Sequence, residues 1–273
     1  MSNFSTIYRE FVRTSVRADS YYGFDLRALA RLEPFLSFLF FDWWKVKFAG
    51  LELLPQKGPA VIAGNQGSTI PWQALMLMYA LMSYKEGPRR VHIMCDLDWI
   101  DDERLNAFLL EIGFVPWSSA NMKRLLSKGE LVAVFPEGVA GLSKPFSQRY
   151  RLQDLDWTRL LPAIEEGVEV FPLATIGCDE AVPVIANVPG IASFLKMPYF
   201  PVTPFFPWLP FPLNFASYPV QWRMRLMAPI SYEHSDDRTH NHETAQTLTH
   251  RLEGELQSEI NRLLRARSHN NGR

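Results

Sequence analysis

Short apolar runs alternate with segments of helical periodicity through the middle of the chain. Residues 72–82 are apolar on nearly every side, which predicts a helix buried within a packed layer. Residues 223–227 alternate between basic and apolar side chains and predict an exposed edge strand. Four apolar runs predict buried strands: residues 60–63, 91–95, 131–135 and 168–173. Strands alternating with helices predict an α/β fold, with a mostly parallel central sheet flanked by helices.

Two further helices are predicted between these strands, and another near the end of the chain. The first follows acidic residues 101–103, with Leu105, Phe108, Leu109 and Ile112 on one face, and the second follows Ser118. The last has an apolar residue at every fourth position, which predicts an amphipathic helix docked on the domain and fraying beyond Arg265. These positions are Leu248, Leu252, Leu256, Ile260 and Leu264.

The pattern divides the chain into three parts. Residues 1–48 are predicted to form amphipathic helices, residues 49–232 the α/β domain, and residues 233–273 a linker and the last helix. Within the domain, residues 197–222 carry no charge over 26 positions, long enough to cross a bilayer. Seven of them are proline, which breaks helices and leaves backbone groups that hydrocarbon cannot satisfy. We therefore expect an irregular segment and no transmembrane span.

Three segments are candidates for contact with a membrane surface. Near the start of the chain, apolar residues recur at helical spacing beside a stripe of arginines, and residues 34–45 are rich in Phe and Trp. The first segment fits either a helix packed on the domain or a monotopic anchor at an anionic leaflet. The aromatic residues of 197–222 likewise fit either packing on the core or a place at the headgroup boundary. The residues of the first segment are Phe4, Ile7, Tyr8, Phe11 and Val12, with Arg9, Arg13 and Arg17.

Composition narrows the classes of partner. The 273 residues are 47% hydrophobic and carry a formal charge of −1, so no basic field is available to hold a nucleic acid. The two cysteines have no metal-ligand spacing, so neither a disulfide scaffold nor a zinc site is expected. No secretory signal is recognised at the start, and we expect peripheral, monotopic attachment to the cytoplasmic face of a membrane.

Candidate chemistry lies at two strand ends, where ligands bind in such sheets. Residues 64–73 form a polar loop between a buried strand and a buried helix. Residues 135–141 place an acid and two glycines directly after the most apolar strand.

These blocks resemble the glycerolipid acyltransferases, the group that includes lysophosphatidic acid acyltransferases and tafazzin-like proteins. Residues 135–138 match the FPEG motif, and residues 58–65 match the strand that leads into the catalytic NHxxxxD block. Residues 113–116 and 168–173 fall where the GxxF-like and VPV-type motifs are expected, in a resemblance that runs from about Trp43 to Pro229. It implies transfer of an acyl group from acyl-CoA or acyl-carrier protein to a glycerolipid or lysophospholipid hydroxyl.

The catalytic block departs from this family pattern. The resemblance implies a His general base and an orienting Asp, but Gln66 occupies the His position. The usual spacing places the Asp at Pro71, and a longer loop places it at Gln73. A glutamine amide takes up no proton near pH 7, so the family mechanism is expected to be crippled, while hydrogen bonding to a ligand survives.

The remaining candidates are binding residues. Glu137 fits either binding of a phosphate-bearing acceptor, as the family implies, or capping of the following turn through backbone N–H groups. Lys144 and Arg149 fit either a phosphate site or a solvated basic turn. Ser68 lacks a nearby base as a nucleophile and is kept as a binding residue. The other residues assigned to substrate binding are Asn65, Phe135, Pro136 and Gly138. Acidic residues 96–102 are explained by helix caps, and neither a metal nor a cofactor is expected.

Three functions fit the sequence. The first is a catalytically impaired family member that binds a lipid or acyl donor or serves as an accessory subunit. The second is an active lysophospholipid O-acyltransferase, of the 1-acylglycerol-3-phosphate type, with a non-standard base. The third is a purely structural partner of an active relative or of a membrane complex.

Overall fold

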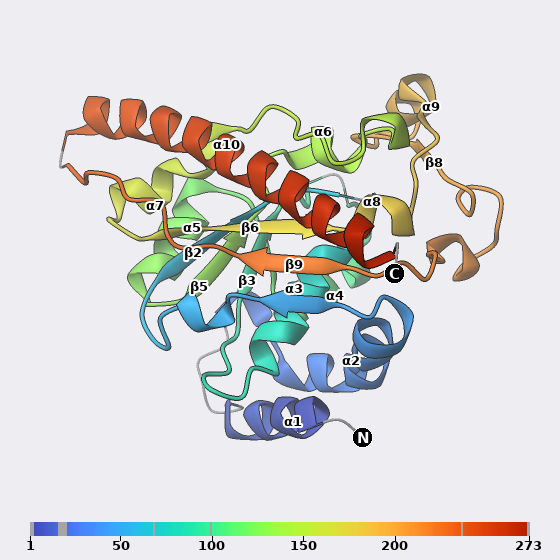
Figure 1. The fold of residues 1–273 in the computed structure, drawn as a ribbon, viewed down its shortest axis with the longest axis horizontal. Helices are drawn as coiled ribbons and strands as arrows, with labels where there is room; N and C mark the ends of the chain where they lie inside the picture. The colour runs from blue at the N-terminus through green and yellow to red at the C-terminus, as the bar shows by residue number, and fades with distance from the viewer. Residues whose placement is uncertain (1–2, 16–20, 68, 99, 236, 272–273) are drawn as a thin grey trace.

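A seven-stranded sheet forms the centre of the molecule, with helices on both faces (Figure 1). The computed structural model describes residues 3–15, 21–67, 69–98, 100–235 and 237–271. The order of strands across the sheet is β1-β9-β6-β2-β5-β3-β4, and β7 pairs with β8 separately. The strands are β1 Lys47–Ala49, β2 Ala60–Gly64, β3 His92–Cys95, β4 Phe114–Pro116, β5 Leu131–Val134, β6 Val170–Ile176, β7 Ala186–Asn187, β8 Pro201–Val202 and β9 Arg223–Leu226.

The predicted mostly parallel sheet is confirmed. Neighbouring strands from β6 across to β4 run parallel, β1 and β9 also run parallel to each other, and β9 meets β6 antiparallel. The predicted edge position of β9 is wrong, because β1 lies outside it. Met224 and Leu226 are buried while Arg225 is exposed, as the alternation predicts. Alternation reports the two faces of a strand and carries no information about its lateral neighbours.

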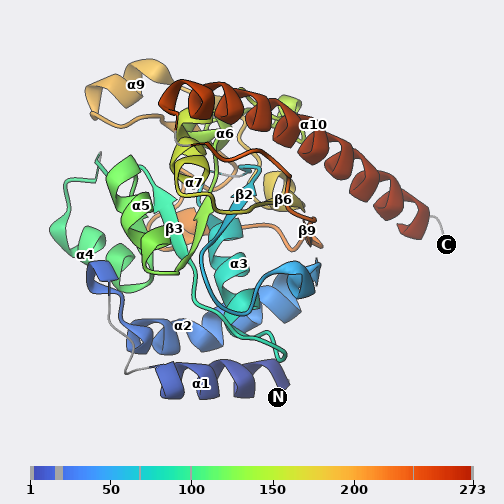
Figure 2. The same ribbon diagram turned by 90° about the vertical axis from the view of Figure 1, so that its left-hand side faces the viewer.

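Two layers of helices cover the sheet because alternate side chains of each central strand point to opposite faces. In β2, Ala60 and Ile62 belong to the cluster with α2 and α3, whereas Val61 and Ala63 belong to the cluster with α5, α7 and α10. Figure 2 shows α1 and α2 on one side of the sheet and α10 on the other. The helices are α1 Asn3–Ser15, α2 Leu26–Phe38, α3 Trp72–Met82, α4 Glu103–Glu111, α5 Ser119–Ser127, α6 Gly138–Leu142, α7 Leu161–Glu165, α8 Cys178–Ala181, α9 Pro189–Phe194 and α10 Arg238–Asn271.

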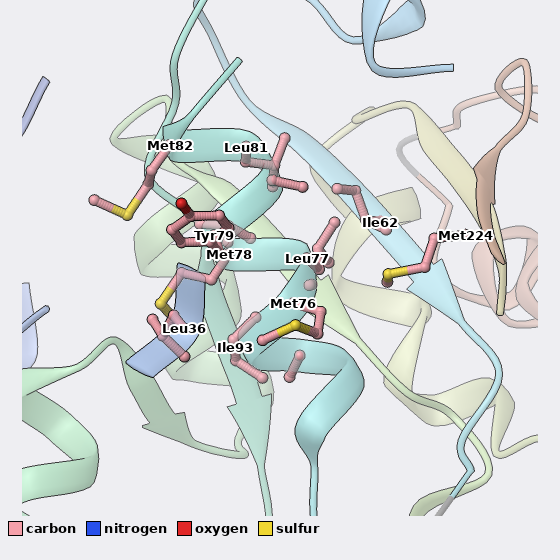
Figure 3. Packing of buried hydrophobic residues seen from close by; sticks show 14 of the residues in the cluster. Leu36, Ile62, Met76, Leu77, Met78, Tyr79, Leu81, Met82, Ile93 and Met224 are labelled. Carbon is pink, nitrogen blue, oxygen red and sulfur yellow. The ribbon is translucent and has the colours of Figure 1, made fainter. Parts of the chain in front are cut away.

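Helix α3 is the buried helix that the apolar run predicts. It is covered on one side by the sheet and on the other by α2, so that residues around its whole circumference are buried. Figure 3 shows its Met76 and Leu77 side chains among residues from three other elements, Leu36 of α2, Ile62 of β2 and Met224 of β9. A helix apolar on every side requires such a sandwiched position.

The N-terminal helices pack on the domain through part of their apolar residues. Tyr8 of α1 is fully buried and lies 5.4 Å from the ring of Tyr79, centre to centre, while Phe11 packs against the same core. The side chains of Phe4 and Val12, and all of Arg17, lie outside the described residues. Helix α2 continues into a π-helical turn, Leu39–Trp43, and leaves Phe35 and Phe38 exposed. Among the described helices, none combines the length and the apolar character needed to cross a bilayer.

Of two predictions about the outer helices, one is confirmed in part and one is wrong. On the predicted face of α4, Ile112 is buried and Leu109 packs against the core, whereas Leu105 and Phe108 are exposed. Helix α10 continues beyond Arg265 to Asn271. There Arg267 donates hydrogen bonds of 2.6 and 2.7 Å to both carboxylate oxygens of Glu180, which anchors the last turns to α8.

Glu130 at the start of β5 makes the stability of the fold dependent on pH. Arg90 Nε donates a 3.0 Å hydrogen bond to its carboxylate, and His92 Nε2 lies 3.5 Å from the same oxygen. Burial acts to raise the pKa of Glu130, but the close contacts with His92 and Arg90 outweigh it and lower the pKa to about 2. The ionised form is therefore favoured by folding.

We expect the free energy of unfolding to fall as the pH is lowered from about 5 to about 2, by an amount of order 2–3 kcal/mol from this carboxylate. The sign follows from a folded-state pKa below the unfolded one, which stabilises the protein only above the unfolded pKa. Urea unfolding of the wild type and of Glu130→Gln across this range measures it. The variant should show a shallower dependence on pH, and parallel curves for the two proteins would contradict the assignment.

Candidate functional site

Polar residues follow the carboxyl ends of four neighbouring parallel strands and lie along the same edge of the sheet. Because β3, β5, β2 and β6 are neighbours in that order, the segments after their carboxyl ends lie together. The loop that begins with Asn65 follows β2, Glu137 follows β5, Asp179 follows β6 and Asp96 follows β3. The two blocks predicted from the sequence, after β2 and after β5, are therefore brought side by side.

Glu137 connects these two blocks through its buried carboxylate. Its Oε1 accepts a 2.6 Å hydrogen bond from the backbone N–H of Gln66, and its Oε2 accepts a 2.8 Å bond from the backbone N–H of Gln153. The Gln66 and Glu137 side chains start next to each other around Gly141 of α6. A Cβ atom at Gly141 would come within 2.4 Å of Cβ of Gln66 and 2.8 Å of Cβ of Glu137, so only glycine fits there.

Lys144 places a buried ammonium group beside this carboxylate. Its Nζ donates hydrogen bonds to the backbone oxygens of Gln66 at 3.3 Å and Arg151 at 3.2 Å. It also lies 4.0 Å from Glu137 Oε2 and 3.8 Å from Asp179 Oδ1. Its charge is directed at protein groups, and contact with a ligand phosphate stays a prediction.

Asp179 belongs to the site although sequence reasoning did not single it out. It lies in α8, directly after β6, and its Oδ2 accepts a 3.1 Å hydrogen bond from the backbone N–H of Tyr150. A Cβ atom at Gly67 would lie 3.2 Å from Asp179 Oδ1 and 2.3 Å from Cys178 Sγ, which places α8 directly against the loop after β2. An acid just after an apolar strand was the available signal, as it was for Glu137.

Two carboxylates therefore share one ammonium group in a buried cluster. Burial raises the pKa of Glu137, while Lys144 and the two backbone N–H donors lower it and Asp179 raises it further. Burial likewise raises the pKa of the Cys178 thiol well above its ordinary value, so this cysteine is a neutral apolar neighbour rather than a nucleophile. The cluster is suited to holding backbone in place more than to attracting an anion.

Gln66 and Gln73, the two residues that the sequence resemblance predicts at the catalytic positions, are both buried. Gln73 lies in the first turn of α3 with none of its surface exposed. Within the part of the chain that the structure describes, neither its Oε1 nor its Nε2 has a hydrogen-bond partner, so it is not bonded to Gln66. An unsatisfied buried amide costs about 1–3 kcal/mol, and a ligand or ordered water that bonds to it recovers that cost.

The other predicted binding residues mostly hold the scaffold. Asn65 donates from Nδ2 to the Thr175 backbone oxygen at 3.1 Å and accepts from the Thr175 N–H at 2.7 Å, which extends the pairing of β2 with β6. The ring of Phe135 covers Gly64. The Pro136 carbonyl accepts a 3.0 Å hydrogen bond from the backbone N–H of Asp156.

Three predicted residues lie away from this cluster or cannot be placed in it. Gly138 has a φ of 53° and faces the guanidinium of Arg159, whose Nη2 would lie 3.3 Å from a Cβ there. Arg149 is exposed and lies over the ring of Phe146, 4.4 Å from its centre. Ser68 lies outside the described residues.

Arg159 is a second basic residue at this edge that the sequence did not reveal. It donates hydrogen bonds of 3.0 and 2.7 Å to the two oxygens of Asp96, so its charge is already neutralised. The interpretation of acidic residues 96–102 as helix caps is confirmed for Asp102, which caps α4 through the backbone N–H of Leu105 at 2.8 Å, but not for Asp96, which binds Arg159.

All six histidines are described, and none is placed in the buried cluster. His92 begins β3 at the opposite end of the strand and contacts Glu130. The others lie in the segment before α10 or on that helix, where His234 contacts the Ile164 carbonyl and His269 the Arg265 carbonyl. No imidazole substitutes for the one that the family pattern has at position 66.

The chain matches one protein family and is similar to proteins of two mycobacteria. The model of the family described as Acyltransferase matches residues 45–205, more than half of the chain and inside the range of the predicted resemblance. An uncharacterized protein of Mycobacterium leprae is 31% identical over 202 residues, and one of Mycobacterium tuberculosis is 30% identical over 211 residues. These alignments cover 74% and 77% of this chain but only 55% and 59% of the mycobacterial proteins.

Among solved structures, the chain is similar to the 1-acyl-sn-glycerophosphate (LPA) acyltransferase PlsC from Thermotoga maritima. The identity is 15%, the TM-score is 0.49, and the match covers 93% of this chain and 95% of that one.

Removing the ammonium group of Lys144 tests the role of the buried cluster. We expect Lys144→Met to lower the free energy of unfolding by about 3 kcal/mol or more, because two buried carboxylates then lose the ammonium group that lies 4.0 and 3.8 Å from them. Lys123→Met is the matched control, since Lys123 is partly exposed and its ion pair with Glu165 contributes less than about 1 kcal/mol. Urea unfolding at neutral pH measures both, and equal losses would contradict a structural role for Lys144.

Proposed function

The chain belongs to the acyltransferase family, and from that premise we propose that it is a catalytically impaired member that binds a glycerolipid or an acyl donor. The observation that carries the proposal is the pair of buried amides, Gln66 and Gln73, in the catalytic block of an otherwise well-connected site. Acyl transfer to a hydroxyl needs a group that removes its proton, and an amide cannot act as that base.

The size of the expected loss follows from the chemistry. A positioned general base contributes about 10²–10⁴ in rate, and more where the base and its orienting carboxylate act as a unit. Glu137 is the nearest carboxylate by its contacts, but both of its oxygens accept backbone hydrogen bonds and one lies 4.0 Å from Lys144. Taking a proton there would weaken the interactions that hold the site together.

Binding, in contrast, needs only shape and hydrogen-bonding groups. The backbone of Gln66 is held on both sides, by the Glu137 carboxylate at its N–H and by Lys144 at its carbonyl. The loop after β2 therefore keeps a defined conformation without a catalytic His. The Gln73 amide, for which the described residues provide no hydrogen-bond partner, offers a donor and an acceptor to an ester, thioester or hydroxyl group of a ligand.

Family membership supports a lipid as the ligand, and a lysophospholipid is the substrate class we propose. The donor would be acyl-CoA or acyl-carrier protein, bound without efficient transfer. Attachment to a membrane surface would bring such a protein to its ligand. An accessory role beside an active enzyme is compatible with the same binding activity.

Acyl transfer by purified wild-type protein to a lysophospholipid should not exceed the background rate. The double variant Gln66→His, Gln73→Asp should raise the rate by about 10² or more, because it restores a base and its orienting carboxylate. Release of CoA thiol from acyl-CoA measures the reaction. Gln246→His, on an exposed turn of α10, serves as the control for an added imidazole and should have no effect.

Activity in the wild type that Gln66→Ala abolishes would overturn the proposal in favour of the active enzyme with a non-standard base. Ligand binding is tested separately by calorimetry with a short-chain lysophospholipid. Replacing Gln73 with Leu removes the amide at similar volume and should weaken binding by about tenfold, the effect of one buried hydrogen bond. Equal affinity of Gln73→Leu and wild type would exclude that amide from the binding site.

A further inference from the structure

Exposed apolar side chains gather on one segment of the chain. Most of the large hydrophobic side chains that are exposed among the described residues lie between residues 185 and 218, which we call the aromatic surface. Phe194 is 86% exposed, Phe211 79% and Trp208 68%. Single exposed apolar residues need no explanation, but so many of them within one short stretch of the chain indicate a site of interaction.

The charge of this segment is unusual as well. Between Glu180 and Arg223 the only charged residue is Lys196, which is itself exposed. Because this segment has no carboxylate, its insertion has no free-energy cost for the dehydration of an acid, and anionic lipid does not repel it. Aromatic side chains are also the ones that favour the boundary between headgroups and acyl chains.

The aromatic surface is tied to the loops of the candidate site. Tyr199 donates from its hydroxyl to the backbone oxygen of Thr69 at 2.6 Å, in the loop that follows Gln66. The backbone N–H of Tyr218 donates to the Ala181 carbonyl at 2.7 Å, at the end of α8. In Figure 1, α9 and β8 lie on the same side of the molecule as α8. The segment therefore borders the carboxyl edge of the sheet, where the site lies.

Helix α2 extends the aromatic surface. Trp43 donates from its indole nitrogen to Ser217 Oγ at 3.1 Å, and its ring lies 5.9 Å from that of exposed Phe38. Phe35, also exposed, lies 6.2 Å from the ring of Trp72 at the start of α3. Residues 34–45 and residues 197–222, two of the segments that the sequence predicts for membrane contact, are thus in contact with each other.

From these observations we infer that the aromatic surface docks on a phospholipid bilayer and turns the edge of the sheet that carries Gln66 and Gln73 toward the membrane. The inference rests on the proposed function for the identity of the ligand, since a lysophospholipid would then enter from the bilayer. The occupant is a lipid surface rather than a second copy, because aromatic side chains favour the boundary between headgroups and acyl chains, and residues 185–218 carry no acid that would be repelled by an anionic leaflet.

Co-sedimentation with vesicles of phosphatidylcholine and phosphatidylglycerol tests the docking. Wild-type protein should sediment with the vesicles. The partition coefficient of the double variant Phe194→Ser, Phe211→Ser should be lower by about tenfold or more. Leu53→Ser is the control, because Leu53 is an exposed apolar residue in the segment leading to the amino end of β2, at the opposite edge of the sheet. Equal losses in the two variants, or no binding by the wild type, would overturn the inference.

Insertion of the surface can be measured by fluorescence. Vesicles with brominated acyl chains should quench wild-type tryptophan emission, and Trp208→Phe should remove a large part of that quenching while the protein still sediments with vesicles. Trp44 and Trp222 are fully buried and serve as internal references. Unchanged quenching in Trp208→Phe would overturn insertion. Light scattering gives the oligomeric state. If the wild type is a dimer that does not bind vesicles and the Phe194→Ser, Phe211→Ser variant is a monomer, the aromatic surface binds a second copy of the chain and not a bilayer.

A failure of docking can be told apart from a failure of the proposed function. A short-chain lysophospholipid below its micelle concentration reaches the site without a bilayer. The Phe194→Ser, Phe211→Ser variant should bind it as the wild type does, because these side chains lie outside the buried cluster. Loss of monomer binding together with vesicle binding in this variant would mean that the substitutions damage the site, and the separate docking role would be withdrawn.

Discussion

The carboxylate of Glu137 is the interaction on which the arrangement of the site depends. It accepts backbone hydrogen bonds from two segments that are distant in sequence, at Gln66 and at Gln153, and it does so where water is excluded. A buried carboxylate is tolerated only when it is paired and fully hydrogen-bonded, and Lys144 supplies the pairing. The same group thus fixes the loop after β2, the turn after β5 and the segment that leads toward α7.

This constraint separates the framework of the site from its chemistry. Glu137 and Lys144 contact the backbone of Gln66 and not its amide, so they hold the loop in the same way whichever side chain stands at position 66. A residue there can lose the ability to accept a proton without any change in the fold. Fold and family are therefore compatible with a range of activities, and the side chains at the site must decide among them.

The parts of the structure that sequence could predict are those with a strong local signal. The apolar run of α3 and the apolar strands β2 and β5 follow from side-chain patterns alone, since burial on all sides leaves no other explanation. Asp179 joins the site only because α8 packs under Gly67, a contact between segments about 110 positions apart. The exposed face of α4 was also beyond prediction, because pattern shows which side chains are apolar and not whether a layer exists to cover them.

Charge also bears on which side chain can stand at position 73. Gln73 is fully buried in the first turn of α3, and the nearby loops already contain two buried carboxylates, Glu137 and Asp179, that share the ammonium of Lys144. An aspartate at position 73 would add a further buried negative charge, which is tolerable beside an imidazolium and costly without one. Once position 66 carries an amide, a neutral side chain at position 73 is the less costly choice. Under the proposed function the pair therefore forms one consistent state of the site, without a group at position 66 to take the proton and without a charge at position 73 to support it.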